Sequence, residues 1–325
     1  MILLYTVILV IGFLALVKGS DIFVNGSSEL AKSFHVPSLI IGLTIVAFGT
    51  SAPELAVSTL AAFQGSNEIA LSNVIGSNIF NLLGVLGVSA AIYPLPVDKH
   101  ILKRDFPFSI ITTGVLLSLS SVPSILGERF AIPSPDQNIG TITGMTGLFL
   151  VVCFAGYTAF LIYTAIKQPV EDPGTNNKPA GKCILQIITG LVLVIAGGQA
   201  VVYGAKEIAR AAGMTETLIG LTIVAIGTSL PELVTSVTAA RKGETELAVG
   251  NALGSNIFNL LLILGVSAII HPLSVNGASL YDLIILLLTS ILAFTFALSA
   301  KRLARPEGII MITLYMADII FAVLR

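Results

Sequence analysis

Two six-residue segments carry the side chains best suited to chemistry, GTSAPE at 49–54 and GTSLPE at 227–232. Each places one acidic residue, Glu54 or Glu232, near the middle of an otherwise uncharged apolar stretch. A carboxylate is costly inside an apolar segment long enough to span a bilayer, so its presence there indicates a function. Carboxylate, hydroxyl and carbonyl oxygens form a hard ligand set, which suits Ca²⁺ and Na⁺ rather than soft metals.

The same segments predict a break in the helix that contains them. Proline removes a backbone donor and disfavours helix in the residue before it, so each stretch should form two half-helices. Ser51 and Glu54 have the spacing of a capping box, as do Ser229 and Glu232. This pattern predicts that each serine begins the second half-helix and caps it with its own side chain.

Further oxygen ligands are predicted in two places. A broken helix frees carbonyl groups of its first half, and such backbone is tolerated at membrane depth only where it is buried in protein or lines a cavity. In the GSNIFN segments, 76–81 and 254–259, a serine and an asparagine four residues apart share one helix face. The candidates are the threonines before the serines, Thr50 and Thr228, the carbonyls of Ala47 and Ala225, and the side chains of Ser51, Ser229, Ser77, Asn81, Ser255 and Asn259. The secondary candidates are Asn73, Asn78, Asn251 and Asn256.

Simpler interpretations of these motifs stay open. The two glutamates could only cap their half-helices, although a cap does not require a break in the middle of a span. The GSNIFN segments could only pack helices together through Gly and Ser, although packing does not need two amides per copy. Lys18 and Asp21, three residues apart, are expected to pair with each other rather than to bind a ligand.

The elements that must position these residues are written twice in the chain. Residues 41–55 and 219–233 are identical at 13 of 15 positions, and residues 72–95 and 250–273 at 17 of 24, both at an offset of 178. The motif regions 41–95 and 219–273 are therefore the cores of an internal duplication. The two glutamates should meet near the axis that relates the two copies.

The composition of the chain indicates that these elements lie in a membrane. The 325 residues are 55% hydrophobic and 11% charged, with a mean hydropathy of +0.95, whereas a soluble domain carries about 25% charged residues. Apolar runs long enough to span a bilayer recur along the chain, and they are continuous, which favours helices over a barrel. Ten spans are predicted, near 3–20, 38–63, 69–93, 106–122, 141–165, 184–204, 217–240, 247–271, 280–298 and 307–324. The first is interpreted as a helix, because it lacks the basic start and cleavage site of a signal peptide.

The expected fold is an all-α integral membrane protein with ten transmembrane helices. They form two five-helix repeats, 1–166 and 183–325, joined by a polar cytoplasmic linker at 167–182, and helices 2 and 7 are broken. An odd number of spans per repeat predicts that the second copy is inverted. Twelve Lys and Arg residues follow odd-numbered spans and four lie on the other side. The positive-inside rule therefore predicts a multi-pass plasma-membrane protein with both termini extracytoplasmic.

The sequence lacks the residue patterns that are typical of nucleic-acid-binding proteins and of intramembrane hydrolases. The net charge of −1 and the absence of a basic tract give no indication of nucleic-acid binding. The spans contain no Ser–His, Asp–Asp or HExxH arrangement of an intramembrane hydrolase, so no enzymatic activity is expected. No cofactor and no obligate protein partner are expected; the bilayer and transported ions are the expected partners.

At the two duplicated motifs the chain resembles the calcium/cation antiporter superfamily, specifically the sodium/calcium exchanger branch and its prokaryotic members. That family is marked by G-[TS]-S-x-P-E and G-S-x-x-x-N segments, once per half, and both copies are intact here. The resemblance implies Na⁺/Ca²⁺ antiport by alternating access, with Glu54 and Glu232 as calcium ligands beside Thr50 and Thr228. It implies that the sodium sites use the four serines and the carbonyls of Ala47 and Ala225, with Asn81 and Asn259 in the middle.

The resemblance also implies finer properties of the transport cycle. More than two Na⁺ per Ca²⁺ would make exchange electrogenic, and the first and sixth helices would slide to switch access. Asn81 and Asn259, where potassium-dependent relatives have an acidic residue at the second position, favour potassium-independent exchange. Ca²⁺/H⁺ antiport is the alternative, although proton-coupled relatives usually carry G-N-x-x-E in place of GTSxPE; a cation channel is a further alternative.

Overall fold

Helices make up almost all of the described chain. The computed structural model describes residues 2–127, 134–135, 137–167, 179–214 and 225–324. Within these residues, seven helices are long and apolar enough to cross a membrane, or eight if the bent pair Ser38–Thr50 and Ala52–Phe63 counts as one span. The protein is therefore an all-helical membrane protein, with short strands only between helices.

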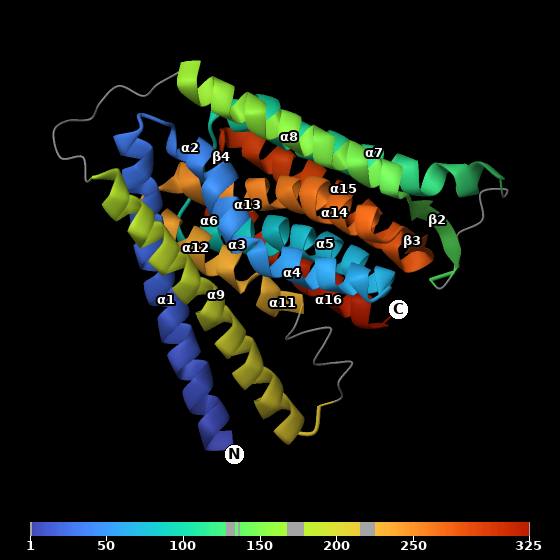
Figure 1. Ribbon diagram of the computed structural model, residues 1–325, viewed down its shortest axis with the longest axis horizontal. Coiled ribbons are helices and arrows are strands. Elements are labelled where there is room, and N and C mark those ends of the chain that lie inside the picture. Colours follow the sequence, from blue (N-terminus) through green and yellow to red (C-terminus); the bar gives the residue numbers. More distant parts are fainter. Residues whose placement is uncertain (1, 128–133, 136, 168–178, 215–224, 325) are drawn as a thin grey trace.

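The two halves have corresponding elements (Figure 1). The first half contains α1 (Ile2–Ser33), α2 (Ser38–Ile41), the π-helix η1 (Gly42–Val46), α3 (Ala47–Thr50), α4 (Ala52–Phe63), α5 (Asn67–Phe80), the π-helix η2 (Asn81–Leu86), α6 (Gly87–Ile92), β1 (Leu95–Pro96), the π-helix η3 (Ile101–Asp105), α7 (Phe106–Gly127), β2 (Asn138–Ile142) and α8 (Gly144–Lys167). The second half contains α9 (Ala180–Ala211), α11 (Ala225–Thr228), α12 (Leu230–Arg241), α13 (Thr245–Phe258), the π-helix η5 (Asn259–Ile263), α14 (Leu264–Ile270), β3 (Leu273–Asn276), α15 (Gly277–Ala300), β4 (Arg302–Leu303) and α16 (Arg305–Leu324). Helices α1, α4 and α5 match α9, α12 and α13 at the same offset of 178 residues that relates the sequence motifs.

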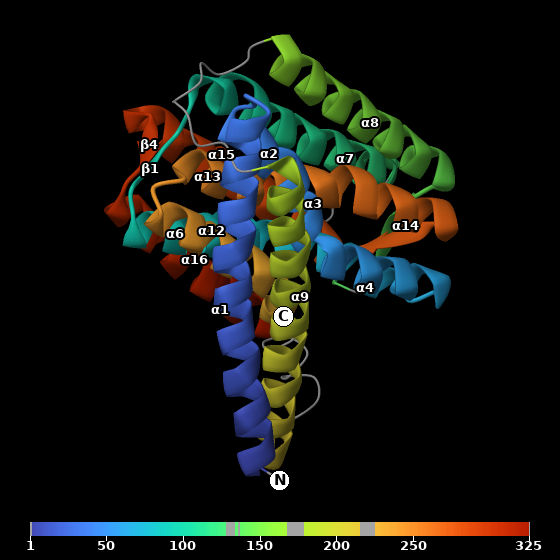
Figure 2. The same ribbon diagram turned by 60° about the vertical axis from the view of Figure 1, so that its left-hand side comes forward.

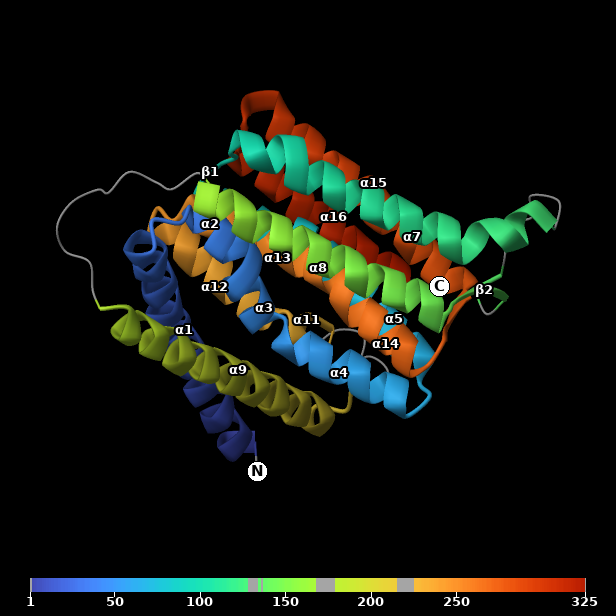
Figure 3. The ribbon, with the colours of Figure 1, turned by 45° about the horizontal axis from the view of Figure 1, so that its top comes forward.

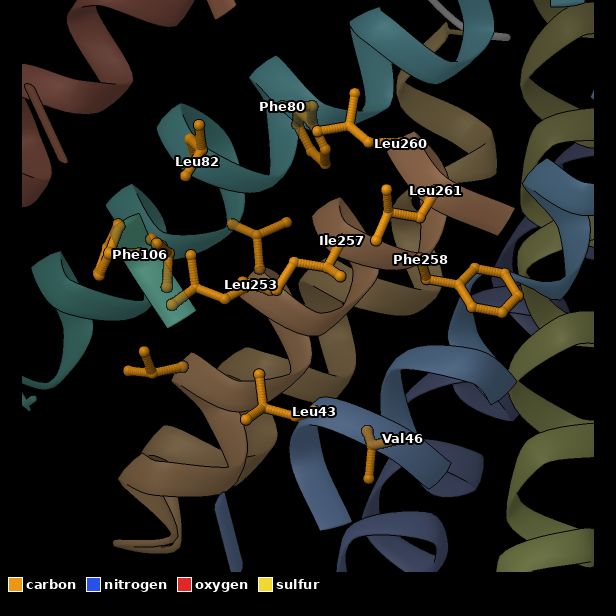
Figure 4. Close-up of a cluster of buried hydrophobic side chains, with 14 of the residues drawn as sticks. Leu43, Val46, Phe80, Leu82, Phe106, Leu253, Ile257, Phe258, Leu260 and Leu261 are labelled. Atoms are coloured by element: carbon orange, nitrogen blue, oxygen red, sulfur yellow. The ribbon is translucent and has the colours of Figure 1, made fainter. Parts of the chain in front are cut away.

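The helices that carry the GSNIFN segments form the centre of the bundle. In the continuous helices Glu68–Ile92 and Thr245–Ile270, 78% of the most apolar window is buried, against 28% or less in the other spans. Apolar side chains such as Phe80, Leu253 and Ile257 pack between them (Figure 4). A helix with apolar residues on all sides is stable only where other helices or lipid surround it, and here helices surround these two.

Helices α1 and α9 are the longest in the protein, at 32 residues each, and they lie side by side along one flank of the bundle (Figure 2). Their backbones approach closely through glycines: a Cβ atom at Gly190 would lie 2.5 Å from the backbone nitrogen of Phe23. These helices contain the predicted spans 3–20 and 184–204 and extend beyond them. Helix α1 continues past its apolar run because serines such as Ser27 and Ser28 are buried against neighbouring helices.

The turn between α12 and α13 holds α1 through charged side chains. Lys242 Nζ lies 2.5 Å from the Asp21 carboxylate and donates to Asn25 Oδ1 at 2.7 Å. The prediction that Asp21 pairs with Lys18 is wrong, because the α12–α13 turn brings Lys242 to it from the second half.

The same contact continues along α1 in both directions. Ser20 Oγ donates to Thr238 Oγ1 at 2.7 Å, and Ser28 donates to Glu244. Lys32 Nζ lies 3.9 Å from the same glutamate. We call the contacts of Lys242 and Glu244 with α1 the α1 latch.

Two short antiparallel ribbons join the halves. β1 pairs with β4, with Leu95 opposite Leu303, and β2 pairs with β3, with Ile142 opposite Leu273. Each ribbon takes one strand from each half. Figure 3 shows β2 near one end of α7. These strands are two to five residues long and were not predicted from the sequence.

Candidate functional site

Both glutamates begin the second half of a broken helix, as predicted. In the first half, α2, η1 and α3 run to Thr50, and the chain bends by 49° before α4. Ser51 sits at the bend with φ −83° and ψ 8°, and Ser229 has nearly the same backbone, φ −93° and ψ 10°, between α11 and α12. The residues before α11, 215–224, lie outside the described chain, so the start of predicted span 7 is not compared.

The serines at the breaks do not cap their own helices. Neither makes a side-chain hydrogen bond to its helix. Instead Ser51 Oγ donates to Glu232 Oε1 at 2.8 Å, and Ser229 Oγ donates to Glu54 Oε1 at 2.8 Å. Each second half-helix begins at its serine, as predicted, but the prediction that the serine side chain caps that helix is wrong. A charged acceptor buried in low dielectric gains more from a hydroxyl donor than a helix end does, so each serine serves the glutamate of the other half.

These reciprocal bonds place the two carboxylates next to each other at the centre of the protein. Glu54 and Glu232 are both fully buried. In the described part of the chain neither takes part in an ion pair with a basic residue. Two buried carboxylates without a cationic partner are strongly destabilising unless a cation binds or they are protonated.

The site also contains oxygens without hydrogen-bond partners. Buried polar atoms are nearly always paired, and here the described chain leaves a group of them unpaired on the broken helices and on the central helices that pack against them. They are Oε2 of Glu54 and Glu232, the hydroxyls of Thr228 and Ser255, Oδ1 of Asn81, Asn256 and Asn259, and Nδ2 of Asn81. All but one of these atoms are oxygens, which fits a bound cation rather than an anion.

The remaining predicted residues lie nearby but are partly engaged. Ser77 Oγ lies 3.5 Å from Glu54 Oε1, at the limit of a hydrogen bond. The Thr50 hydroxyl lies 3.1 Å from the Val46 carbonyl oxygen and 3.0 Å from Asn251 Oδ1.

The prediction that the break frees the carbonyl of Ala47 from helical hydrogen bonding is wrong. This carbonyl still accepts from the backbone N–H of Ser51 at 3.0 Å, because the helix bends after this bond instead of before it. A carbonyl oxygen has a second lone pair and can still accept a cation. Ala225, its counterpart, is the first residue of α11.

Two asparagines on the central helices form hydrogen bonds to the broken helices, a role that was not predicted from the sequence. Asn73 Nδ2 donates to Ser58 Oγ at 2.9 Å, and Asn251 Nδ2 donates to Ser236 Oγ at 2.9 Å. Both serines lie one turn beyond a glutamate and are related by the same offset of 178. The repetition of a serine at this position in both halves could have indicated its role in the sequence. These bonds fix each half-helix against the neighbouring central helix.

A second missed feature is the backbone at the asparagine ligands. The π-helices η2 and η5 begin at Asn81 and Asn259 respectively. π-helical turns occur frequently at functional sites. Among the described residues no group of three or more His, Cys, Asp or Glu side chains forms a cluster of the kind that holds a resident metal ion. The site is thus built from two carboxylates and neutral oxygens.

Known proteins share both the sequence and this architecture. The family model for the sodium/calcium exchanger protein matches residues 4–163 and 182–324. CaxA of Alkalimonas amylolytica is 36% identical, over 95% of this chain and 96% of its own length. The sodium/calcium exchanger MaX1 of Methanosarcina acetivorans is 32% identical, over 96% of this chain and 97% of its own.

A solved structure agrees with the fold over its whole length. The sodium-calcium exchanger NCX_Mj, soaked with 2.5 mM Na⁺ and 0.1 mM Ca²⁺, superposes with a TM-score of 0.82 at 31% identity and covers 100% of both chains. The family match covers most of the chain, and the relatives agree with it over nearly their full length. The chain belongs to the sodium/calcium exchanger family.

Proposed function

We propose that the protein exchanges Na⁺ for Ca²⁺ across the membrane by alternating access. The observation that carries this proposal is the pair of buried glutamates, each bonded to the serine of the other half, on helices whose buried cores hold further unpaired oxygens. Hard oxygen ligands of this kind suit Ca²⁺ and Na⁺. The relatives named above include a sodium/calcium exchanger, which supports the same substrates.

The proposed ligands are the twelve groups predicted from the sequence. Calcium would be held by Glu54 and Glu232 with Thr50 and Thr228, and sodium by serine hydroxyls and by the carbonyls of Ala47 and Ala225. The serines are Ser51, Ser77, Ser229 and Ser255, and the amides of Asn81 and Asn259 complete the middle of the site. No cofactor is needed, since the ions are the substrates.

The charge of the site accounts for obligatory exchange. Two ionised glutamates give the empty site a charge near −2, which is costly in the low dielectric of the protein centre. One Ca²⁺ or several Na⁺ relieve this charge, so the loaded protein can pass through an occluded state and the empty one cannot. More than two Na⁺ per Ca²⁺ would make the exchange electrogenic. Neutral amides at 81 and 259 support independence from K⁺.

We further propose ten spans in two inverted five-helix repeats, with the linker 167–182 and the α1 latch on the cytoplasmic side. The corresponding elements of the two halves and the ribbons shared between them support this arrangement. Both termini would be extracytoplasmic and the membrane would be the plasma membrane. Helices α1 and α9, packed closely along their length, would slide together against the central helices.

Uptake of radioactive calcium into proteoliposomes tests the function. Vesicles loaded with Na⁺ and diluted into Na⁺-free, K⁺-free buffer should take up calcium, faster at an inside-positive potential. Glu54→Gln and Glu232→Gln should each abolish uptake. Glu68→Gln, which changes an exposed glutamate outside the site, is the matched control and should retain it.

Three outcomes would contradict parts of the proposal. Uptake that ignores Na⁺ and follows a pH gradient would indicate Ca²⁺/H⁺ antiport. Calcium current without a counter-ion would indicate a channel. A strict requirement for K⁺ would refute only the potassium independence.

A further inference from the structure

Two asparagines that are not among the proposed ligands join the central helices at the axis between the halves. Asn78 Nδ2 donates to the backbone carbonyl of Asn256 at 3.3 Å, and Asn256 Nδ2 donates to the backbone carbonyl of Asn78 at 3.2 Å. Both side chains are fully buried. The two bonds form a reciprocal clamp between α5 and α13.

The clamp determines which way the Asn78 amide faces. A backbone carbonyl can only accept a hydrogen bond, so the group of Asn78 that points to it must be the NH₂. Its Oδ1 is then left as an acceptor, and Asn259 Nδ2 donates to it at 3.0 Å. Asn259 therefore presents its NH₂ to Asn78, and its Oδ1 stays buried and unpaired among the other oxygens of the site.

The equivalent contact is absent in the other half. Asn81 corresponds to Asn259, but both of its amide atoms are unpaired, and Oδ1 of Asn256 is unpaired too. Of the two amides at 81 and 259, only the one at 259 is oriented by a neighbour. The two middle ligands are therefore not equivalent, although their sequences are.

We propose that Asn78 is a positioning residue that turns the carbonyl oxygen of Asn259 toward the ions and selects a neutral amide at that position. A carboxylate at 259 would place an oxygen against Asn78 Oδ1, where two acceptors face each other without a proton between them. Asn78 could relieve that contact only by rotating its amide, which would break its bond to Asn256. This inference rests on the proposed ion site and adds a residue that controls its charge.

The repeat supplies a matched test. Asn259→Asp and Asn81→Asp add the same charge to the same site, but only the first faces Asn78. Half-saturating Na⁺ and Ca²⁺ concentrations are measured at alkaline pH from the ion-induced rise in Tm of the purified full chain, so that binding is read without transport. We expect half-saturation of Asn259→Asp to lie about tenfold above that of Asn81→Asp, the factor for a buried acceptor left without a donor.

Two further backgrounds separate orientation from packing. Asn78→Leu has a similar volume and removes one bond of the clamp together with the facing oxygen, so the ratio of the two half-saturating concentrations should fall from about ten to about one. Asn256→Leu removes one bond of the clamp but leaves Asn78 Oδ1 in place, so the difference should persist. If Asn78→Leu does not fold, Asn78→Ser serves the same comparison. A merely structural role would make the Asn78 and Asn256 backgrounds behave alike.

The outcomes distinguish this inference from the proposed function. If the wild type binds Na⁺ and Ca²⁺ and exchanges them, but Asn259→Asp and Asn81→Asp have equal half-saturation while Asn78 is unchanged, the orienting role is refuted and exchange stands. Persistence of the difference in both Asn78→Leu and Asn78→Ser would refute it as well. If the wild type shows no ion-induced rise in Tm, the ion site and the inference both fail.

Discussion

The α1 latch joins α1 to the α12–α13 turn, and the described residues show no corresponding side-chain contact at the α4–α5 turn. That asymmetry can be tested by exchange of residues between the two turns. Lys242 and Glu244 correspond to Gln64 and Ser66 of the first half. The double variant Lys242→Gln/Glu244→Ser therefore replaces the latch with side chains that the same turn already carries in the other repeat. It leaves every proposed ion ligand unchanged.

The size of the effect follows from exposure. The Lys242 and Asp21 side chains are 26% and 46% exposed, and those of Glu244 and Lys32 are 25% and 44% exposed. Partly exposed ion pairs contribute about 0.2–1 kcal/mol each, so the latch should contribute roughly 0.5–2 kcal/mol in total. At 1.4 kcal/mol per factor of ten, its loss shifts the balance between the two access states by about 2- to 30-fold.

The direction of the shift is fixed by where the latch lies. It holds α1 against α12 at the proposed cytoplasmic side, so it favours the state that is closed there. Apparent affinity on one face falls in proportion to the population of the state open to that face. In oriented proteoliposomes, the double variant should need about 2- to 30-fold less Ca²⁺ for half-maximal exchange at the cytoplasmic face, with little change at the other face.

A charge exchange serves as the control. Asp21→Lys/Lys242→Asp preserves the ion pair and should lie closer to the wild type than either single variant. Equal changes at both faces, or no change in the double variant, would refute the reasoning, because they would show that the latch does not distinguish the two states.

Three further predictions concern stability, measured as the Tm of purified protein. Ser229→Ala removes the donor to Glu54 and should lower the Tm of the ion-free protein, since a hydrogen bond to a charged group contributes about 1.5–3 kcal/mol; a Tm equal to that of the wild type would contradict the cross-repeat bond. Gly190→Val should lower the Tm by more than any exposed substitution in the same helix, because even a Cβ atom would lie 2.5 Å from the Phe23 backbone nitrogen and overpacking costs about 1–3 kcal/mol. Asp105→Asn removes the charge of a fully buried carboxylate that accepts a hydrogen bond from Arg104 at 2.6 Å. It should lower the free energy of unfolding by about 2 kcal/mol, below the 3–5 kcal/mol for a fully desolvated pair. An unchanged Tm would show that this ion pair does not stabilise the fold.

The broken helices illustrate what local sequence can and cannot predict. Proline near the middle of an apolar span predicts the break itself, because its effect on the backbone is local. The serine at the break also has a local partner in the capping-box pattern, and that prediction fails. Its actual partner, Glu232 for Ser51, lies 181 residues away, and only the three-dimensional relation of the repeats reveals it.

The ends of helices and the fine structure of the backbone were harder to predict for a different reason. Helix α1 extends to Ser33, past its apolar run, and several of its polar side chains there contact the α12–α13 turn: Ser28 bonds to Glu244, and Asn25 bonds to Lys242. The π-helical turns at Asn81 and Asn259 depend on how the central helices pack, not on their composition. The orientation of the Asn259 amide is likewise invisible in a sequence in which Asn81 looks equivalent.

The shared ribbons mean that neither half is a complete folding unit. A single copy of the five-helix unit would expose the edges of β1 and β2, and its one glutamate would lack the serine that donates to it. In the proposed inverted arrangement, two separate copies could satisfy one another only if they met in opposite orientations in the membrane. Joining the copies in one chain fixes that pairing and lets the two then diverge, so that one repeat can hold the latch and orient an amide while the other keeps neither.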